Sequence, residues 1–257
     1  MNQAIERFQL QNQLVLITGA SSGIGRHCAR LMASAGAKVA LAARRFEPIQ
    51  ALAEEINQQG GQARAYEMDV TQIDVVKVAF DQICTWGIPN IVINNAGTSV
   101  SKSILEQSEA DWDRVIDTNL KGVWLVATEA ARRMIQAKQG GTMINVASIL
   151  AERQIGGVAP YAISKAGVVQ MTKTMALELA RYQIRVNAIL PGYVITELNR
   201  DFLQSEQGEK LRLRIPSRTF CELSDLDGPL LLLASDAGCA MSGSTLTVDR
   251  GHLVSSL

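Results

Sequence analysis

Three glycines, Gly19, Gly23 and Gly25, follow an apolar stretch near the start of this 257-residue sequence. The apolar run 14–17 has the length of a strand, and apolar residues recur with helical spacing over 24–35, so the glycines occupy a strand-to-helix turn. Backbone without Cβ can lie against a pyrophosphate, whose charge then meets free N–H groups and the positive end of the helix dipole. The predicted phosphate site also includes Ser21, Ser22 and Ile24.

The spacing of these glycines is neither the commoner G-x-G-x-x-G fingerprint nor a P-loop, which would end in Gly-Lys-Ser/Thr. A turn that binds no ligand is therefore the alternative interpretation of this motif when it is taken alone. The later segments of the chain favour a dinucleotide.

A pair of arginines ends the second predicted strand, which covers residues 38–43. In a dinucleotide fold a carboxylate at this point would hold the ribose hydroxyls of NAD, whereas an arginine can accept the 2′-phosphate of NADP. Arg44 lies nineteen residues after Gly25, which is the distance expected for that position. The sequence therefore favours NADP(H) over NAD(H). For Arg45 a solvated strand end is the alternative.

Polar residues follow two further predicted strands. After the strand 63–68, the carboxylate of Asp69 could accept from the adenine amino group while the backbone of Val70 contacts the ring, or it could cap the next helix. Asn94-Asn95-Ala96-Gly97 follows the strand 90–93. Its small residues allow a cofactor to approach, and its two amides can tie adjacent strand ends together. We assign Asn95, Ala96 and Gly97 to the cofactor site.

Four polar side chains in the second half of the chain are candidates for chemistry. Ser148 ends a predicted strand over 141–147, and Tyr161 follows it by thirteen residues. Tyr161 and Lys165 are four residues apart, so they share one face of a predicted helix. Asn119 falls among apolar residues of another helix, where its amide must find partners, either structural ones or a chain of water.

Strands alternate with helices along the sequence, which predicts right-handed βαβ crossovers and a parallel sheet covered on both faces. We therefore expect an α/β protein with a Rossmann-like, doubly wound parallel sheet of about seven strands, and a single domain over 1–257. Ligands of such sheets bind outside the carboxyl ends of the strands. Two predicted helices, 111–138 and 160–182, carry more apolar surface than one sheet face should hide.

Composition restricts the partners. The 25 acidic and 25 basic side chains cancel, so no long-range field recruits nucleic acid or an anionic membrane. The first 13 residues lack a signal-peptide core and no apolar run reaches membrane-spanning length, so we expect a cytoplasmic protein. The cysteines are scattered and histidines are few, which predicts reduced thiols and no metal site. These cysteines are Cys28, Cys84, Cys221 and Cys239.

Taken in order, the motifs resemble those of the short-chain dehydrogenases/reductases in their compact single-domain form. Each motif alone is modest evidence, whereas the ordered set is specific and spans nearly the whole chain. The matching residues are Thr18-Gly19-x-x-x-Gly23-x-Gly25, Asn94-Asn95-Ala96-Gly97, Asn119, Ser148, Tyr161-x-x-x-Lys165 and Pro191-Gly192.

The resemblance implies a catalytic tetrad of Asn119, Ser148, Tyr161 and Lys165. Ser148 would hydrogen-bond the substrate carbonyl, and Tyr161 would donate a proton to the alkoxide that forms as the nicotinamide delivers hydride. Lys165 would hold the nicotinamide ribose and lower the pKa of Tyr161, while Asn119 would anchor water that connects Lys165 to solvent. A tyrosine pKa near 7 requires about 4 kcal/mol. One ammonium at roughly 4 Å supplies about that much at an effective dielectric near 20, so we expect Lys165 to do most of this tuning.

The resemblance also implies a nicotinamide site and a lid. The Pro191-Gly192 turn would let the backbone near Val194 approach the carboxamide, with Thr196 hydrogen-bonding it or a phosphate. Residues 197–216 would form a flexible substrate lid. The tail 252–257 could line a neighbouring subunit's pocket. Together with the lid, the residues expected to line the substrate pocket are Ser99, Val100, Ile149, Leu150, Gln154, Ile155 and Tyr193. Arg250 departs from the glycine often found there, which concerns the C-terminal turn.

The function implied is that of an NADP(H)-dependent oxidoreductase that interconverts a ketone, including a 3-oxoacyl thioester, and a secondary alcohol. Both 3-oxoacyl thioester reductases and sugar-acid or polyol dehydrogenases resemble this chain, so an NAD(P)-dependent dehydrogenase of the second kind is one alternative. A non-catalytic NADP(H)-binding sensor or scaffold is another. The family suggests that the surplus apolar helix surface is packed in a homotetramer or a homodimer.

Overall fold

The computed structural model describes residues 3–197 and 199–255, and these fold around a seven-stranded sheet. The strands lie in the order β3-β2-β1-β4-β5-β6-β7 and every pairing is parallel. The order reverses between β1 and β4, which leaves a crevice at their carboxyl ends. This confirms the Rossmann-like, doubly wound fold. The strand bounds are β1 Leu14–Thr18, β2 Lys38–Ala43, β3 Gln62–Glu67, β4 Ile91–Asn94, β5 Gly141–Val146, β6 Ile184–Pro191 and β7 Thr245–Val248.

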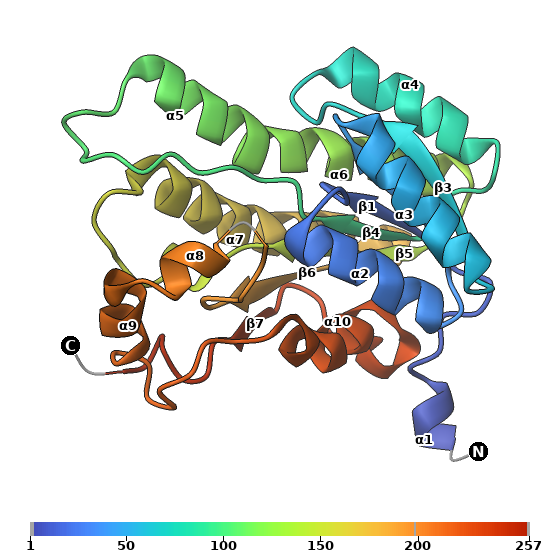
Figure 1. Cartoon of the computed structure of the whole chain (residues 1–257). Coiled ribbons are helices and arrows are strands. Elements are labelled where there is room, and N and C mark those ends of the chain that lie inside the picture. Colours follow the sequence, from blue (N-terminus) through green and yellow to red (C-terminus); the bar gives the residue numbers. More distant parts are fainter. Residues whose placement is uncertain (1–2, 198, 256–257) are drawn as a thin grey trace.

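Helices cover both faces of the sheet (Figure 1). One face carries α2 (Gly23–Ser34), α3 (Phe46–Gln58) and α10 (Asp227–Ala234). The other carries α4 (Ile73–Cys84), α6 (Gly122–Gln136) and α7 (Ala159–Leu179). The remaining α-helices are α1 (Gln3–Glu6), α5 (Glu109–Ile116), α8 (Arg200–Leu203) and α9 (Glu206–Arg212).

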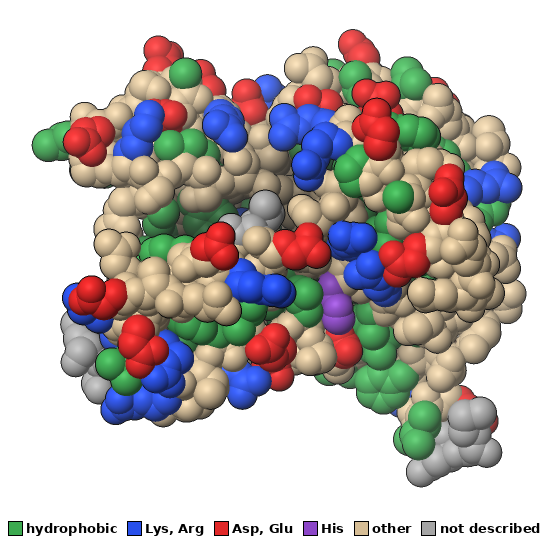
Figure 2. Space-filling view, in the orientation of Figure 1, with side chains coloured by type: hydrophobic (Ala, Val, Ile, Leu, Met, Phe, Trp, Pro, Cys, Tyr) green, Lys and Arg blue, Asp and Glu red, His purple; other side chains and the backbone are tan. Residues whose placement is uncertain are grey.

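A hollow opens on the side of the molecule where α5 faces α8 and α9, on the left of Figure 2. The strands end on this side, so the hollow lies where the topology predicts a ligand site. Across the described residues 3–197 and 199–255, none of the helices is both long and apolar enough to cross a membrane.

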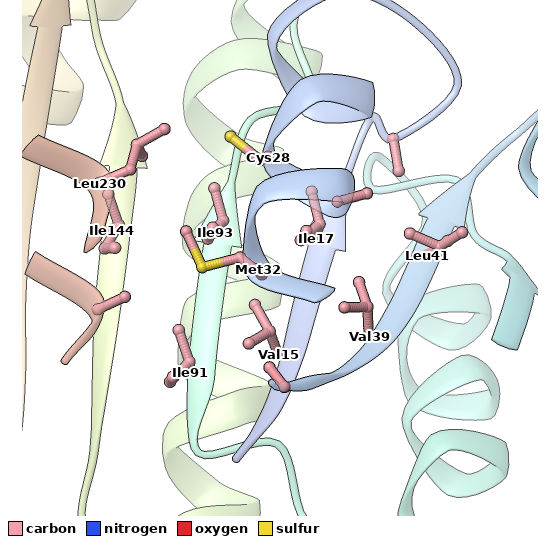
Figure 3. Packing of buried hydrophobic residues seen from close by; sticks show 14 of the residues in the cluster. Val15, Ile17, Cys28, Met32, Val39, Leu41, Ile91, Ile93, Ile144 and Leu230 are labelled. Carbon is pink, nitrogen blue, oxygen red and sulfur yellow. The ribbon is translucent and has the colours of Figure 1, made fainter. Parts of the chain in front are cut away.

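The core consists of two apolar layers separated by the sheet. Val15 and Ile17 of β1 point toward Met32 of α2 (Figure 3), whereas Leu14 and Leu16 belong to the opposite layer. Side chains alternate along a strand, so a strand buried on both faces is apolar throughout. This explains why the run 14–17 is recognisable as a strand.

The predicted helix over 111–138 differs from the structure in two ways. It is divided into α5 and α6 by a π-helical turn, Asp117–Lys121, which admits an extra residue per turn and rotates the side chains of α6 relative to those of α5. Trp112 and Trp124, two large apolar side chains of this segment, are 41% and 49% exposed. The helix also ends at Gln136, and Lys138 has a left-handed φ of 53°.

The segment predicted as a flexible lid contains two short helices, α8 and α9. Leu203 of α8 and Leu211 of α9 form a small apolar cluster that also contacts Tyr193. Apolar packing of this kind gives the segment a defined shape. Leu198, which belongs to the predicted lid, lies outside the described residues.

The C-terminal turn accommodates Arg250 in a left-handed conformation, with φ at 55°. The Arg250 guanidinium pairs with the Asp225 carboxylate at 2.6 Å. Arg153 Nη1 donates to the carbonyl oxygens of His252, Leu253 and Ser255, which fixes the described part of the tail against its own subunit. Residues 256–257 of the predicted tail lie outside the described residues.

Candidate active site

A cavity of about 1270 Å³ lies at the carboxyl ends of the central strands. It brings together segments from both halves of the chain, as the doubly wound topology requires. The residues predicted for the cofactor that line it are Gly19, Ser21, Ser22, Gly23, Ile24, Arg44, Asp69, Val70, Asn95, Ala96, Gly97, Tyr161, Lys165, Pro191, Gly192, Val194 and Thr196. Within the described part of the chain, Gly25 does not line it.

The glycine turn is held by the end of β4. Asn95 Nδ2 donates to the carbonyl oxygens of Thr18 and Gly19 at 3.0 and 3.1 Å, and Thr18 Oγ1 accepts from the N–H groups of Asn95 and Ala96. Asn94 Nδ2 donates to Asn145 Oδ1 on β5 at 2.9 Å. The prediction that the two amides tie adjacent strand ends together is therefore confirmed.

Two glycines of the turn leave no room for a side chain. Gly19 has φ at 65°, and a Cβ there would lie 2.8 Å from Ala96 Cα. A Cβ on Gly25 would lie 2.3 Å from the carbonyl oxygen of Gly19 and 2.4 Å from Asn95 Nδ2. Gly25 is buried, so its contribution is the close packing of α2 on the turn instead of the cofactor contact that we predicted.

The start of α2 suits a pyrophosphate. Ser22 stands at the N-cap, and within the described residues its side chain accepts no hydrogen bond from the first turn of the helix. The N–H groups at the start of α2 are therefore left without a side-chain cap from Ser22, and Gly23 and Ile24 of this turn line the cavity. A dinucleotide fits here because the negatively charged oxygens of its diphosphate can accept hydrogen bonds from these N–H groups.

Two arginines lie at the other end of the cavity. Arg44 and Arg45 are both exposed and both line it, beside Asp69 and Val70. Arg45 Nη2 donates to Ser21 Oγ at 3.3 Å, which directs its guanidinium toward the glycine turn. The sequence alone does not assign Arg45 to the site, since a solvated strand end explains it equally well. Its adjacency to Arg44 is the signal that could include it.

Asp69 has a third role that neither sequence alternative named. Its Oδ1 accepts from the N–H and Oγ1 of Thr71 at 3.0 and 2.8 Å, so the carboxylate closes the turn after β3. The next helix, α4, has Gln72 at its N-cap, so the helix-cap interpretation of Asp69 is wrong. The carboxylate still lines the cavity.

Ser148, Tyr161 and Lys165 meet on the wall of the cavity. Ser148 Oγ accepts from the N–H of Leu150 at 3.1 Å, and the Ser148 side chain lies close enough to the Tyr161 phenol to favour its ionised form. Lys165 Nζ donates to the carbonyl oxygen of Val146 at 2.7 Å and lies 5.5 Å from the centre of the Tyr161 ring. Two hydroxyls therefore converge on one point, with an ammonium group behind one of them.

The pKa values differ from our expectation for Tyr161. Removal from water raises the pKa of its phenol, and the nearby Ser148 side chain offsets this only in part. Burial also lowers the pKa of Lys165 to about 8. Among the described residues, Lys165 therefore does not lower the pKa of Tyr161 as we expected. Burial disfavours its charged form, and its Nζ bonds the carbonyl oxygen of Val146 instead of the phenol.

Asn119 has structural partners and is fully buried. Its Oδ1 accepts from the N–H of Thr98 at 2.7 Å, and its Nδ2 donates to the carbonyl oxygen of Thr98 and to Ser164 Oγ. In the described part of the chain it does not line the cavity. Its amide joins the loop after β4 to the helix that carries Tyr161 and Lys165.

The substrate end of the cavity is lined by Ser99, Ile149, Leu150, Ile155 and Tyr193, as predicted, and also by Ser101, Asn199 and Phe202. Among the described residues, Val100 and Gln154 do not line it, contrary to the prediction. Val100 lies between two serines that face the cavity, and the side chain of Gln154 turns away to donate to the carbonyl oxygen of Glu152.

A family model described as "Enoyl-(Acyl carrier protein) reductase" matches residues 19–252. The 3-oxoacyl-(acyl-carrier-protein) reductase FabG of Staphylococcus aureus (strain Mu50) is 35% identical over 92% of this chain and 96% of its own length. The 2-dehydro-3-deoxy-D-gluconate 5-dehydrogenase of Escherichia coli (strain K12) is 34% identical over 97% and 98%.

A similar solved structure is that of a gluconate 5-dehydrogenase from Burkholderia cenocepacia J2315 in complex with NADP and tartrate. It is 34% identical, covers 99% of this chain and 100% of that one, and has a TM-score of 0.95. The chain belongs to the short-chain dehydrogenase/reductase family. It is an oxidoreductase that depends on a nicotinamide dinucleotide.

Proposed function

We propose that this enzyme uses NADP(H) to interconvert a ketone and a secondary alcohol, with Tyr161 as the proton donor to the new alcohol. The observation that carries the proposal is the convergence of Ser148, Tyr161 and Lys165 in the cavity that also contains the glycine turn. A structural role alone would not require two hydroxyls and a buried ammonium group to line one cavity.

When bound, the nicotinamide supplies or accepts the hydride. Ser148 and Tyr161 donate hydrogen bonds to the carbonyl oxygen, which orients it and stabilises the negative charge that develops there. Because burial raises its pKa, the Tyr161 phenol is protonated at neutral pH and can give up its proton in the reducing direction. Lys165 holds the ribose, and Asn119 fixes the helix beneath them.

The cofactor preference rests on Arg44 and Arg45. Both line the cavity at the end of β2, and an arginine pair can bind a 2′-phosphate, whereas it offers no acceptor to a ribose diol. Asp69 stands beside them but its Oδ1 is engaged by Thr71. These contacts support NADP(H) over NAD(H).

The substrate end supports two substrate classes. Ile149, Leu150, Ile155 and Phe202 present apolar surface that suits the chain of a 3-oxoacyl thioester. Ser99 and Ser101 line the same space and suit a polyhydroxy acid. Three of these apolar residues, Ile149, Leu150 and Ile155, follow Ser148 within seven residues, so we place the 3-oxoacyl or simple ketone first and the sugar-acid dehydrogenase second.

Steady-state assays with NADPH and with NADH, against a 3-oxoacyl thioester, a keto sugar acid and a simple ketone, test this proposal. We expect at least one ketone to be reduced, with kcat/KM about tenfold or more in favour of NADPH. Arg44→Ala should remove most of that preference. A clear preference for NADH contradicts the cofactor assignment, and no hydride transfer with any ketone or alcohol favours the sensor or scaffold.

We also propose a single domain over residues 1–257 and a homotetramer. The exposed apolar side chains that support an interface lie on α5, α6 and α7, and they include Trp112, Trp124 and Leu177. Leu177 is 80% exposed, which is costly for a large apolar group in water.

A further inference from the structure

A line of buried hydrogen bonds runs from β4 through β5 to α7. Asn94 Nδ2 donates to Asn145 Oδ1 at 2.9 Å, and Asn145 Nδ2 donates to Thr172 Oγ1 at 2.8 Å. Thr172 Oγ1 donates in turn to the carbonyl oxygen of Val168 at 2.8 Å. Asn94, Asn145 and Thr172, which we call the amide line, are each 1% exposed or less.

The direction of hydrogen-bond donation along the amide line is fixed at its α7 end, by Thr172. A threonine hydroxyl has one proton, and Thr172 gives it to Val168, so Thr172 can only accept from Asn145. Asn145 must then present its amide nitrogen to Thr172 and its oxygen to Asn94. Asn94 Oδ1 is buried and has no partner among the described residues, so nothing on that side holds this amide. Each bond therefore depends on the one nearer to α7.

The amide line reaches α7 two turns away from Lys165. Seven residues separate Lys165 from Thr172, so both lie on the same side of the helix, about 10 Å apart along its axis. Lys165 bonds the carbonyl oxygen of Val146, which follows Asn145 directly on β5. Helix α7 is thus joined to β5 by two hydrogen bonds, one at each of these points.

Apolar contact fills the space between the two hydrogen bonds. Val168 is fully buried there against Ala147 and Ala188. Such contact is not directional, so it holds the helix on the sheet without defining its rotation or its position along the axis. Directional bonds supply that definition at two places on α7. Asn119 Nδ2 donates to Ser164 Oγ next to Lys165, and Asn145 Nδ2 donates to Thr172 Oγ1 two turns further along the helix.

We propose that Asn145 and Thr172 are positioning residues that keep the Lys165 ammonium group in place beside Tyr161. The proposal rests on the function proposed above, because it concerns a group assigned to the reaction there. It assigns a role in turnover to two side chains that do not line the cavity in the described part of the chain.

The test is a double-mutant cycle of Thr172→Val and Lys165→Met, with turnover measured per cofactor-binding site. Thr172→Val keeps the shape of the side chain and removes its hydroxyl. We expect it to lower kcat about tenfold in the wild-type background, because a small displacement of a reacting group is costly. In the Lys165→Met background it should change kcat by less than about twofold, since the group that it positions is gone.

Three further variants complete the experiment. Thr172→Ser keeps the hydroxyl and should restore kcat. Thr174→Val removes an exposed hydroxyl of the same helix, which bonds the carbonyl oxygen of Gln170, and should leave kcat unchanged. If Thr172→Val does not fold, Asn145→Ala replaces it in the cycle with the same expected result.

An equal loss of kcat in both backgrounds would show a merely structural role and overturn the proposal, as would an unchanged kcat in the wild-type background. The Lys165→Met variant distinguishes an error in the proposed function from an error in the positioning role. If Lys165→Met keeps near-normal turnover, the function assigned to Lys165 is wrong. If Lys165→Met is impaired while Thr172→Val behaves like wild type, only the positioning role is wrong.

Discussion

At the scale of single residues, the enzyme buries the ammonium group of Lys165, although burial disfavours its charged form. Lys165 is 4% exposed, and burial lowers its pKa from 10.5 to about 8. Its hydrogen bond to the carbonyl oxygen of Val146 does not replace the water that an ammonium group loses. A side chain that costs stability in this way is typical of a functional site.

This cost predicts a pH-dependent stability difference between wild type and Lys165→Met. Below about pH 8 both folded and unfolded chains carry the Lys165 proton, so the folded state bears the full cost of the buried charge. Between about pH 8 and pH 10.5 the folded chain loses this proton first, and wild type gains stability relative to the variant. We expect a gain of about 3 kcal/mol, measured by urea unfolding at several pH values. A difference that does not change with pH would contradict the burial argument.

At the scale of elements, the glycine turn and Arg44 were predictable because local chemistry dictates them. A strand buried on both faces is apolar throughout, and a turn against a phosphate requires glycine, so 14–25 could be interpreted without the fold. The division between α5 and α6 could not be predicted, because a π-helical turn leaves no clear mark in the spacing of apolar residues. The partners of Asn119 depend on tertiary packing, and so do the roles of Arg45 and Asp69.

Substitution of Gly25 tests whether close packing of α2 on the glycine turn supports cofactor binding. Gly25→Ala would place its Cβ 2.3 Å from the carbonyl oxygen of Gly19 and displace Asn95, so we expect a loss of several-fold or more in cofactor affinity and about 2 kcal/mol or more in stability. Gly228→Ala is the matched control, because a Cβ at this exposed position in α10 meets nothing within 4 Å. Gly228 precedes Pro229 in the first turn of α10, where a Cβ gains little helix propensity, so this variant should leave affinity unchanged and change stability by less than about 1 kcal/mol. Titration with NADPH and thermal unfolding distinguish the two, and equal behaviour would refute the packing role of Gly25.

At the scale of the whole molecule, the surface suggests that the chain is one part of an assembly. Light scattering should give a mass near four times the 27.8 kDa of one chain. Trp124→Lys places a charge on the 49% exposed tryptophan of α6 and should reduce that mass. Val78→Lys alters an apolar residue of α4 that is 55% exposed, and it should not. A monomer at micromolar concentration, or equal effects of the two variants, would contradict the proposed interface.

The proposed reaction depends most directly on the phenol of Tyr161. The Tyr161→Phe variant tests this dependence, because the substitution removes the phenol oxygen and keeps the ring. The measurement is the single-turnover rate of ketone reduction, together with the affinity for NADPH. We predict a loss of about a thousandfold in rate, with an affinity within about threefold of wild type. A variant that binds NADPH and reduces the ketone at a near-normal rate would show that the proton comes from another group.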